Sequence, residues 1–254
     1  MKSFFSALSL LTVIPVPDGL AKNVHSSSLY FPLVGFFLGI LYYGIANLLY
    51  TAGVPADWIS LVILCAMVVF TGALHLDGLA DMADGFLGGK TKADILRIMK
   101  DSATGVFGSL SLILLLLTKF TGIRHLIENN QLWILIPSAA ISRLSMTVLA
   151  GIFSYGRDRG TGQTVIESTT YLYSALAILY TAGIIVIFHG YASLILLLFG
   201  VSAGILVGLY AFFKINGITG DVLGASSEIG ECLLLVFTPF FYLNFFPDFW
   251  RVWL

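Results

Sequence analysis

Charged residues are scarce in this sequence. Only 11% of the 254 residues are Asp, Glu, Lys or Arg, 58% are hydrophobic, and the mean hydropathy is +0.95. A soluble domain carries about 25% charged residues, so the composition excludes an ordinary soluble protein. It indicates an integral membrane protein embedded in a lipid bilayer. The formal net charge of −1 gives no reason to expect nucleic acid binding.

Closely spaced cysteines and a signal-peptide cleavage site are also missing. Cys65 and Cys232 lie in separate apolar stretches, so neither a disulfide framework nor a zinc finger is indicated. The apolar run 4–14 resembles a signal peptide, but it ends at Pro15 without a small-residue cleavage site. About 12 helical residues rise only about 18 Å, and the hydrocarbon core is about 30 Å thick. We therefore expect a retained interfacial or re-entrant helix at the N-terminus.

Long apolar runs predict an all-α membrane protein with about seven transmembrane helices, forming one domain over residues 1–254. Residues 170–213 contain no Asp, Glu, Lys or Arg. This run of 44 residues is about twice one span, and His189-Gly190 is its expected hairpin break. Counts of six or eight spans stay open. The predicted spans are 29–51, 56–76, 104–120, 132–153, 170–188, 191–213 and 231–247.

Basic residues are distributed unequally between the two sides that seven spans would create. Nine fall on the side of the N-terminus, whereas Lys119, Arg124 and Arg251 fall on the other side. The positive-inside rule then predicts a cytoplasmic N-terminus and a cytoplasmic location for the acidic motifs described next. Residues 91–101 combine an apolar stripe at helical spacing with basic residues, and they predict a short amphipathic helix on the same surface.

The first acidic motif contains Asp77, Asp81 and Asp84, spaced by four and then three residues directly after the uncharged run 58–76. An α-helix would place these side chains within an arc of about 60°. Carboxylates about 6 Å apart repel by roughly 3 kcal/mol per pair at an effective dielectric near 20, so a bound cation is expected. Hard oxygen ligands favour Mg²⁺ or Mn²⁺. The alternative is a helix end whose carboxylates face water. His75 lies about 160° from Asp77 on the helical wheel and is interpreted as a packing residue.

The second acidic motif contains Asp221, Glu228 and Glu231, in the polar segment 217–231 between the last two predicted spans. In a helix these residues share an arc of about 80°, although Gly224 weakens the prediction of an unbroken helix. The predicted topology puts both motifs on one side of the membrane, where together they could hold one or two metal ions over a phosphate. The alternative is that these acids only stabilise a helix N-terminus, a role that fits Glu231 better than Asp221.

Four basic residues are candidates for binding an anionic substrate. Arg143 lies inside the fourth predicted span, where an arginine is costly and is therefore a functional candidate. Its guanidinium group matches phosphate oxygens in bidentate geometry, and the alternative is a structural ion pair with one of the acids. Lys100, Arg157 and Arg159 are the other candidates, and the two arginines could equally be loop charges that set the topology.

The motifs resemble those of the cobalamin synthase family, the adenosylcobinamide-GDP ribazoletransferases. They follow one another in the expected order over almost the whole chain. Ala103-Thr104 departs from the basic residue expected after the Lys-Asp-Ser triplet. The matching strings are Leu11-Thr-Val-Ile-Pro-Val-Pro17, His75-Leu-Asp-Gly-Leu-Ala-Asp-Met-Ala-Asp-Gly85, Ile98-Met-Lys-Asp-Ser102, Ser142-Arg143 and Thr219-Gly-Asp-Val-Leu-Gly-Ala225 with Glu228 and Glu231.

The resemblance implies a Mg²⁺-dependent phosphotransferase of the prokaryotic cytoplasmic (inner) membrane, with its active face in the cytoplasm. Such an enzyme joins adenosylcobinamide-GDP to α-ribazole or α-ribazole 5′-phosphate. The products are adenosylcobalamin or its 5′-phosphate and GMP, in the last step of cobalamin nucleotide-loop assembly. A second copy of the chain or other enzymes of the corrinoid pathway are the candidate protein partners.

The resemblance also implies roles for individual residues. Asp81, Asp84, Lys100 and Arg143 would be catalytic, with the two cations contacting phosphate. Ser102, Arg157 and Arg159 would bind the substrate. The metal ligands would be Asp77, Asp81, Asp84, Asp221 and Glu228.

Three other kinds of protein place acidic residues in membrane helices. CDP-alcohol phosphatidyltransferases and intramembrane prenyltransferases use Asp-rich helices with Mg²⁺. However, Asp81 stands where the first would carry an arginine, and the Asn-Asp-x-x-Asp motif of the second is missing. An ion-coupled transporter would place its acids near the middle of the bilayer, often in paired repeats. Neither feature is visible in the sequence.

Overall fold

The computed structural model describes residues 2–17, 19–21 and 23–245. Helices account for the regular structure of these residues, apart from one isolated bridge between Tyr155 and Ile218. The expectation of an all-α fold is confirmed. In chain order the helices are α1 (Lys2–Leu11), η1 (Ser28–Tyr30), α2 (Phe31–Thr51), α3 (Ala56–Thr71), α4 (Leu74–Gly88), α5 (Lys92–Ile98), α6 (Val106–Glu128), η2 (Leu132–Ile134), α7 (Leu135–Ile152), α8 (Gln163–Ser168), α9 (Tyr171–His189), α10 (Ser193–Ile215) and α11 (Gly220–Phe245).

Six of the described helices are long and apolar enough to cross a membrane, or seven if the bent pair α3–α4 forms one span. This range includes the expected seven, and the predicted hairpin break lies between the end of α9 at His189 and the start of α10 at Ser193. Two expected boundaries were wrong. The third predicted span continues to Glu128, and the last one begins at Gly220 instead of residue 231. Residues 246–247 of that last prediction lie outside the described part of the chain.

The predicted span 56–76 is broken near its end. Gly72 and Ala73 both adopt left-handed backbone conformations, with φ values of 60° and 57°. Two consecutive residues of this kind cannot continue a right-handed helix. As a result α4 leaves α3 at 87°, and the first acidic motif lies on a separate helix with its own direction.

Helix α7 is the centre of the bundle, with 89% of its most apolar 18-residue window buried. It packs against α2, α9, α10 and α11. The closest approach is to α2, where a Cβ atom on Gly35 would lie 2.6 Å from the Cα atom of Ala140. Small residues allow membrane helices to pack this closely. Helices α9 and α10 are only 22% and 33% buried in their most apolar parts, as lipid-facing helices are.

Two short helices lie outside this set of long helices. Helix α1 is too short to be a span and packs on α2. Helix α5 begins with a capping box in which Thr91 and Asp94 bond each other's backbone N–H groups, and it packs on α4. Both short helices were expected from the sequence, although α5 is shorter than the predicted range 91–101.

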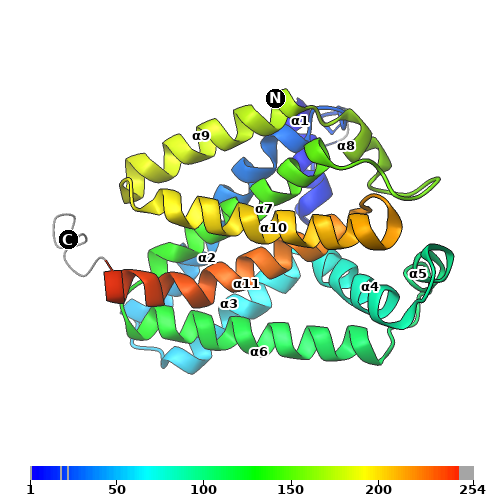
Figure 1. The fold of residues 1–254 in the computed structure, drawn as a ribbon. Helices are drawn as coiled ribbons and strands as arrows, with labels where there is room; N and C mark the ends of the chain where they lie inside the picture. Colours follow the sequence, from blue (N-terminus) through cyan, green and yellow to red (C-terminus); the bar gives the residue numbers. More distant parts are fainter. Residues whose placement is uncertain (1, 18, 22, 246–254) are drawn as a thin grey trace.

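One end of the long helices carries the polar segments (Figure 1). Helices α4 and α5, the turn between α10 and α11, and the loop before α8 all lie at this end, whereas the described chain ends at the opposite end of the bundle. A hydrogen bond of 3.1 Å from Lys214 Nζ to the carbonyl of Phe86 joins the end of α10 to α4. Both acidic motifs therefore begin at the same end of the molecule.

Candidate metal and phosphate site

The two acidic motifs meet where α4 packs against the start of α11. Asp77 and Asp81 lie on α4, and Asp221 lies in the first turn of α11. Gly78 makes the contact, because a Cβ atom there would lie 2.8 Å from the carbonyl oxygen of Asp221. Burial, and then the negative charges of Asp77 and Asp221, raise the pKa of Asp81. Carboxylates from two separate elements thus share one site.

Arg157 supplies positive charge to this site. Gly156 N donates a hydrogen bond of 2.8 Å to the carbonyl of Ile218, and Ile218 N donates one of 2.9 Å to the carbonyl of Ser154. This short pairing is tight because Gly217 has φ 156° and a Cβ atom there would lie 2.7 Å from the Cα atom of Gly156. The pairing brings Arg157 Nη2 to 2.9 Å from Asp221 Oδ2.

Asp84 pairs with backbone N–H groups instead of a charged side chain. Its Oδ2 atom accepts a hydrogen bond of 2.6 Å from Gly105 N, and its Oδ1 atom accepts one of 2.9 Å from Gly108 N. These N–H groups are at the start of α6, where backbone donors lack helical partners and attract a negative charge. Asp84 is buried, and the structure gives it the role of a cap. A role as a metal ligand stays a prediction.

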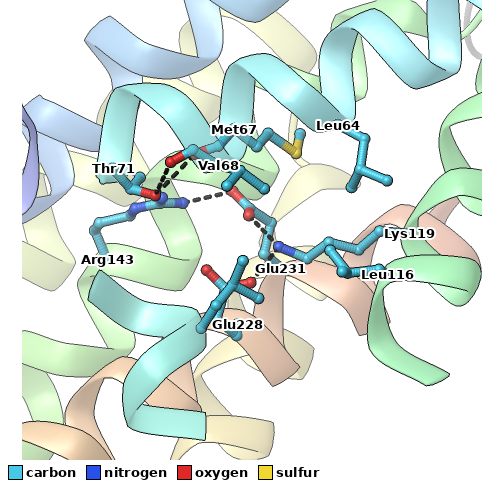
Figure 2. A pocket seen from close by; sticks show the side chains of 10 residues that line it. Leu64, Met67, Val68, Thr71, Leu116, Lys119, Arg143, Glu228 and Glu231 are labelled. Atoms are coloured by element: carbon cyan, nitrogen blue, oxygen red, sulfur yellow. Dashed lines mark hydrogen bonds and ion pairs between the residues drawn. The ribbon is translucent and has the colours of Figure 1, made fainter. Parts of the chain in front are cut away.

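Glu228 and Glu231 lie deeper in the bundle than Asp221, about two and three turns further along α11. Figure 2 shows Glu231 between Arg143 of α7 and Lys119 of α6. Lys119 Nζ lies 2.7 Å from Glu228 Oε2 and 2.6 Å from Glu231 Oε2, and Arg143 Nη1 donates a short hydrogen bond to Glu231 Oε1. All four side chains are at least 94% buried. We call these four residues the buried ion network.

The buried ion network bears on two expectations. Arg143 forms an ion pair, the alternative to phosphate binding, and Glu228 is paired with a lysine. Phosphate binding by Arg143 and metal binding by Glu228 stay predictions. Lys119, near the end of the predicted span 104–120, was expected among the basic residues of the far side of the membrane. It lies instead inside α6, which continues for nine residues beyond it. Lys119 could have been recognised by the same argument that singled out Arg143, since a lysine inside an apolar helix also needs an acidic partner.

A basic pocket of about 640 Å³ lies beside the acidic site. It is formed between α5 and residues 156–158. Arg157 belongs both to this pocket and to the ion pair with Asp221. Ser102 and Arg159 are exposed nearby in sequence, but neither lines the pocket. The four cations that line it are Lys92, Arg97, Lys100 and Arg157.

The acidic site has the chemistry of a divalent cation site without a finished ligand set. Within the described residues, no three Asp, Glu, His or Cys side chains are gathered closely enough to hold a metal ion. This arrangement is expected of carboxylates that repel one another, and Asp221 meanwhile pairs with Arg157. Asp77, Asp81 and Asp221 nevertheless offer hard oxygen ligands from two packed helices, and Mg²⁺ usually takes only a few carboxylates and completes its shell with phosphate and water. The donor set therefore fits Mg²⁺.

Comparisons with known proteins identify the family of the chain. Residues 3–238 match the family model described as cobalamin-5-phosphate synthase. A protein of Shewanella frigidimarina is 39% identical over 92% of both chains, and one of Prosthecochloris aestuarii is 38% identical over 90% of this chain and 94% of its own. One of Clostridioides difficile is 33% identical over 97% of this chain and its whole own length. All three are named adenosylcobinamide-GDP ribazoletransferase. No solved structure matches significantly. The chain therefore belongs to the cobalamin-5-phosphate synthase family.

Proposed function

We propose that this protein joins adenosylcobinamide-GDP to α-ribazole, or to α-ribazole 5′-phosphate, and releases GMP. Family membership over nearly the whole chain supports the reaction. The contact between α4 and α11 supports the location of this reaction in the molecule. It brings Asp77, Asp81 and Asp221 together beside a pocket lined by four cations. A substrate with a pyrophosphate group needs both features, one to hold a cation and one to bind oxygen atoms that the cation leaves free.

Asp77, Asp81 and Asp221 would hold Mg²⁺. The bound ion would neutralise the pyrophosphate and the charge that develops on the leaving GMP. Because Arg157 already pairs with Asp221, it is placed to exchange this carboxylate for a phosphate when a cation takes Asp221. Lys100, at the other wall of the basic pocket, would bind the guanosine phosphate as a point charge.

The chemical step would be an in-line displacement at phosphorus. A hydroxyl oxygen of the ribazole ribose forms a bond to the phosphorus that carries cobinamide, the bond from this phosphorus to the GMP oxygen breaks, and the hydroxyl proton is lost. The chain contributes orientation and charge, which supply most of the catalysis in phosphoryl transfer. Arg143 and Glu228 act only on structure in this proposal, since the buried ion network already pairs both side chains.

We further propose that the active face is cytoplasmic and that the membrane is the prokaryotic inner membrane. The excess of basic residues on the side of the acidic site supports this orientation. Helix α4 and the start of α11, which carry the acids of the site, lie at one end of the bundle (Figure 1), whereas the acids of an ion-coupled transporter lie near the bilayer midplane. The enzyme is thus favoured over the transporter.

The proposed function is tested by incubating the purified protein in detergent with Mg²⁺, adenosylcobinamide-GDP and α-ribazole. We expect GMP and a cobalamin to form in equal amounts, and turnover to stop when EDTA removes the cation and to return when Mg²⁺ is added. A folded preparation that forms neither product would contradict the proposed function.

A further inference from the structure

An apolar cavity of about 180 Å³ opens beside the acidic site. Its wall comes from elements that are distant in the sequence. Asp77 and Asp221 form part of the same wall, so the cavity and the candidate metal site share two residues. The main apolar side chains are Leu10 and Leu11 of α1, Phe31 of α2, Met146 of α7, Val165 of α8 and Leu223 of α11.

We infer that this cavity binds the flat aromatic base of the acceptor nucleoside. The inference rests on the proposed function, because α-ribazole is a ribonucleoside with a benzimidazole base. A ligand in the cavity would have an apolar body within the wall of α1, α7 and α8 and a polar end at Asp77 and Asp221. A nucleoside in this position places its ribose at the carboxylates that would hold the cation, which is where its hydroxyl must attack.

The size of the cavity limits what it can hold. Sites that enclose a whole drug-sized ligand measure about 300–1,000 Å³, so a cavity of about 180 Å³ has room for one bicyclic ring and not for a complete nucleotide. The corrinoid part of the donor is larger still. The cavity therefore takes a fragment of a substrate.

The polarity of the wall distinguishes the bases of the two substrates. Guanine presents more hydrogen-bonding groups than benzimidazole, and each must be satisfied when buried. The polar side chains of the wall are His75, Asp77, Thr161 and Asp221, and the two aspartates are the ones assigned to the cation. Benzimidazole presents one free ring nitrogen. His75 belongs to the cavity wall, and neither of its ring nitrogens has a hydrogen-bond partner although the side chain is only 2% exposed. A small rotation of the imidazole ring would let one nitrogen donate to the base.

Two glycines pack closely together at the polar end of the cavity. A Cβ atom on Gly162 would lie 2.8 Å from the Cα atom of Gly220, and both glycines line the cavity. This contact holds α8 against the first turn of α11, so the apolar wall and Asp221 are fixed relative to each other.

The test fills the cavity from two separate elements of its wall, with Val165→Phe in α8 and Leu11→Phe in α1. We expect each variant to raise the KM for α-ribazole about tenfold or more, since a bulky side chain in a fitted apolar pocket excludes the ligand. The KM for adenosylcobinamide-GDP should change less than about twofold. Val62→Phe is the control, because Val62 is 42% exposed on α3 and lines none of the described pockets.

Direct binding separates this inference from the proposed function. Benzimidazole, titrated calorimetrically into the wild-type protein without donor, should bind, compete with α-ribazole and lose affinity in both filled variants. Val165→Ala, which risks no overpacking, should weaken benzimidazole binding about fivefold through lost apolar contact.

Unchanged benzimidazole binding and an unchanged KM for α-ribazole in these variants would overturn the inference while turnover upheld the proposed function. The inference would also be overturned if a phospholipid occupied the cavity of the wild-type protein and was lost from the filled variants while their KM for α-ribazole stayed unchanged. If benzimidazole binds as expected but no product forms, the proposed function fails instead.

Discussion

At the scale of single residues, the same kind of side chain has opposite roles in this molecule. Asp77 is exposed and Asp81 is half-buried, and neither has an ion pair among the described residues. Glu228 and Glu231 are buried and paired with cations. Burying an unpaired carboxylate is very costly, so the buried acids need Lys119 and Arg143, whereas the acids at the end of the bundle can remain available to a ligand.

Asp81→Asn should abolish turnover and leave the fold intact. The change removes a negative charge from a site where Asp77 and Asp221 already repel that charge, so the folded protein loses no stabilising ion pair. We expect an unchanged melting temperature in detergent with GMP release reduced by at least about 100-fold. Asp57→Asn, at an exposed surface ion pair with Arg124, is the control. Near-normal turnover of Asp81→Asn would remove Asp81 from the site.

Lys119→Met should destabilise the protein strongly. The change leaves Glu228 and Glu231 with only Arg143 as a cation, and breaking a buried ion pair costs about 3–5 kcal/mol. The measurement is the free energy of unfolding in detergent, with exposed Arg124→Met as a control that should change little. The double variant Lys119→Met/Glu228→Gln should recover part of the loss, because it removes the unpaired charge. A double variant no more stable than the single one would contradict the assigned pairing.

At the scale of the elements, two contacts determine where α4 lies. Gly78 lets α4 approach α11, and Asp84 joins α4 to the start of α6. Both contacts involve backbone atoms of the partner helix, so neither can be restored by a change of rotamer. The position of the first acidic motif therefore depends on two helices that follow it in the chain.

Gly78→Ala should lower activity by moving the two acidic motifs apart. The added Cβ atom would lie 2.8 Å from the carbonyl oxygen of Asp221, and overpacking of this kind costs about 1–3 kcal/mol. Gly88→Ala is the matched control in the same helix, because its Cβ atom would meet nothing closer than a side-chain atom at 3.7 Å. We expect turnover to fall in the first variant only. Equal activity of the two variants would show that the α4–α11 contact does not position the site.

Asp84→Ala should destabilise α6 at its first turn. The variant removes the acceptor of Gly105 N and Gly108 N, and losing such a cap costs about 1–2 kcal/mol. The free energy of unfolding measures the loss. Asp84→Asn should lose less, since the amide oxygen still accepts one of the two bonds. Asp101→Ala is the control, because Asp101 accepts its bond in an exposed turn. An unchanged stability of Asp84→Ala would rule out the cap.

At the scale of the whole molecule, the sequence was sufficient for the class of fold and for the helical face of α4. Long uncharged runs show the spans, and the spacing of Asp77, Asp81 and Asp84 shows a helix, because both signals are local. The break at Gly72 and Ala73 was missed, since it lies inside an uncharged run with no proline to mark it. The partners of Lys119 and Asp84 were also missed. Each depends on residues that are distant in the chain, and spacing along one helix cannot show them.

The orientation of the bundle can be tested by cysteine labelling. Ala103→Cys near the acidic site should react with a membrane-impermeant maleimide only in inverted inner-membrane vesicles, because the basic residues predict that this end faces the cytoplasm. Thr51→Cys at the other end of α2 should react only in right-side-out spheroplasts. The native exposed cysteine is removed by Cys65→Ala in both variants. Labelling in the reverse pattern would invert the predicted topology.

Mn²⁺ binding measured by electron paramagnetic resonance tests most directly whether α4 and α11 together form one divalent cation site. We expect that the wild-type protein binds Mn²⁺, that Mg²⁺ displaces it, and that Asp81→Asn in α4 and Asp221→Asn in α11 each weaken binding at least about tenfold. Asp57→Asn should bind like the wild type. Undiminished Mn²⁺ binding in either site variant would contradict a site shared by the two helices.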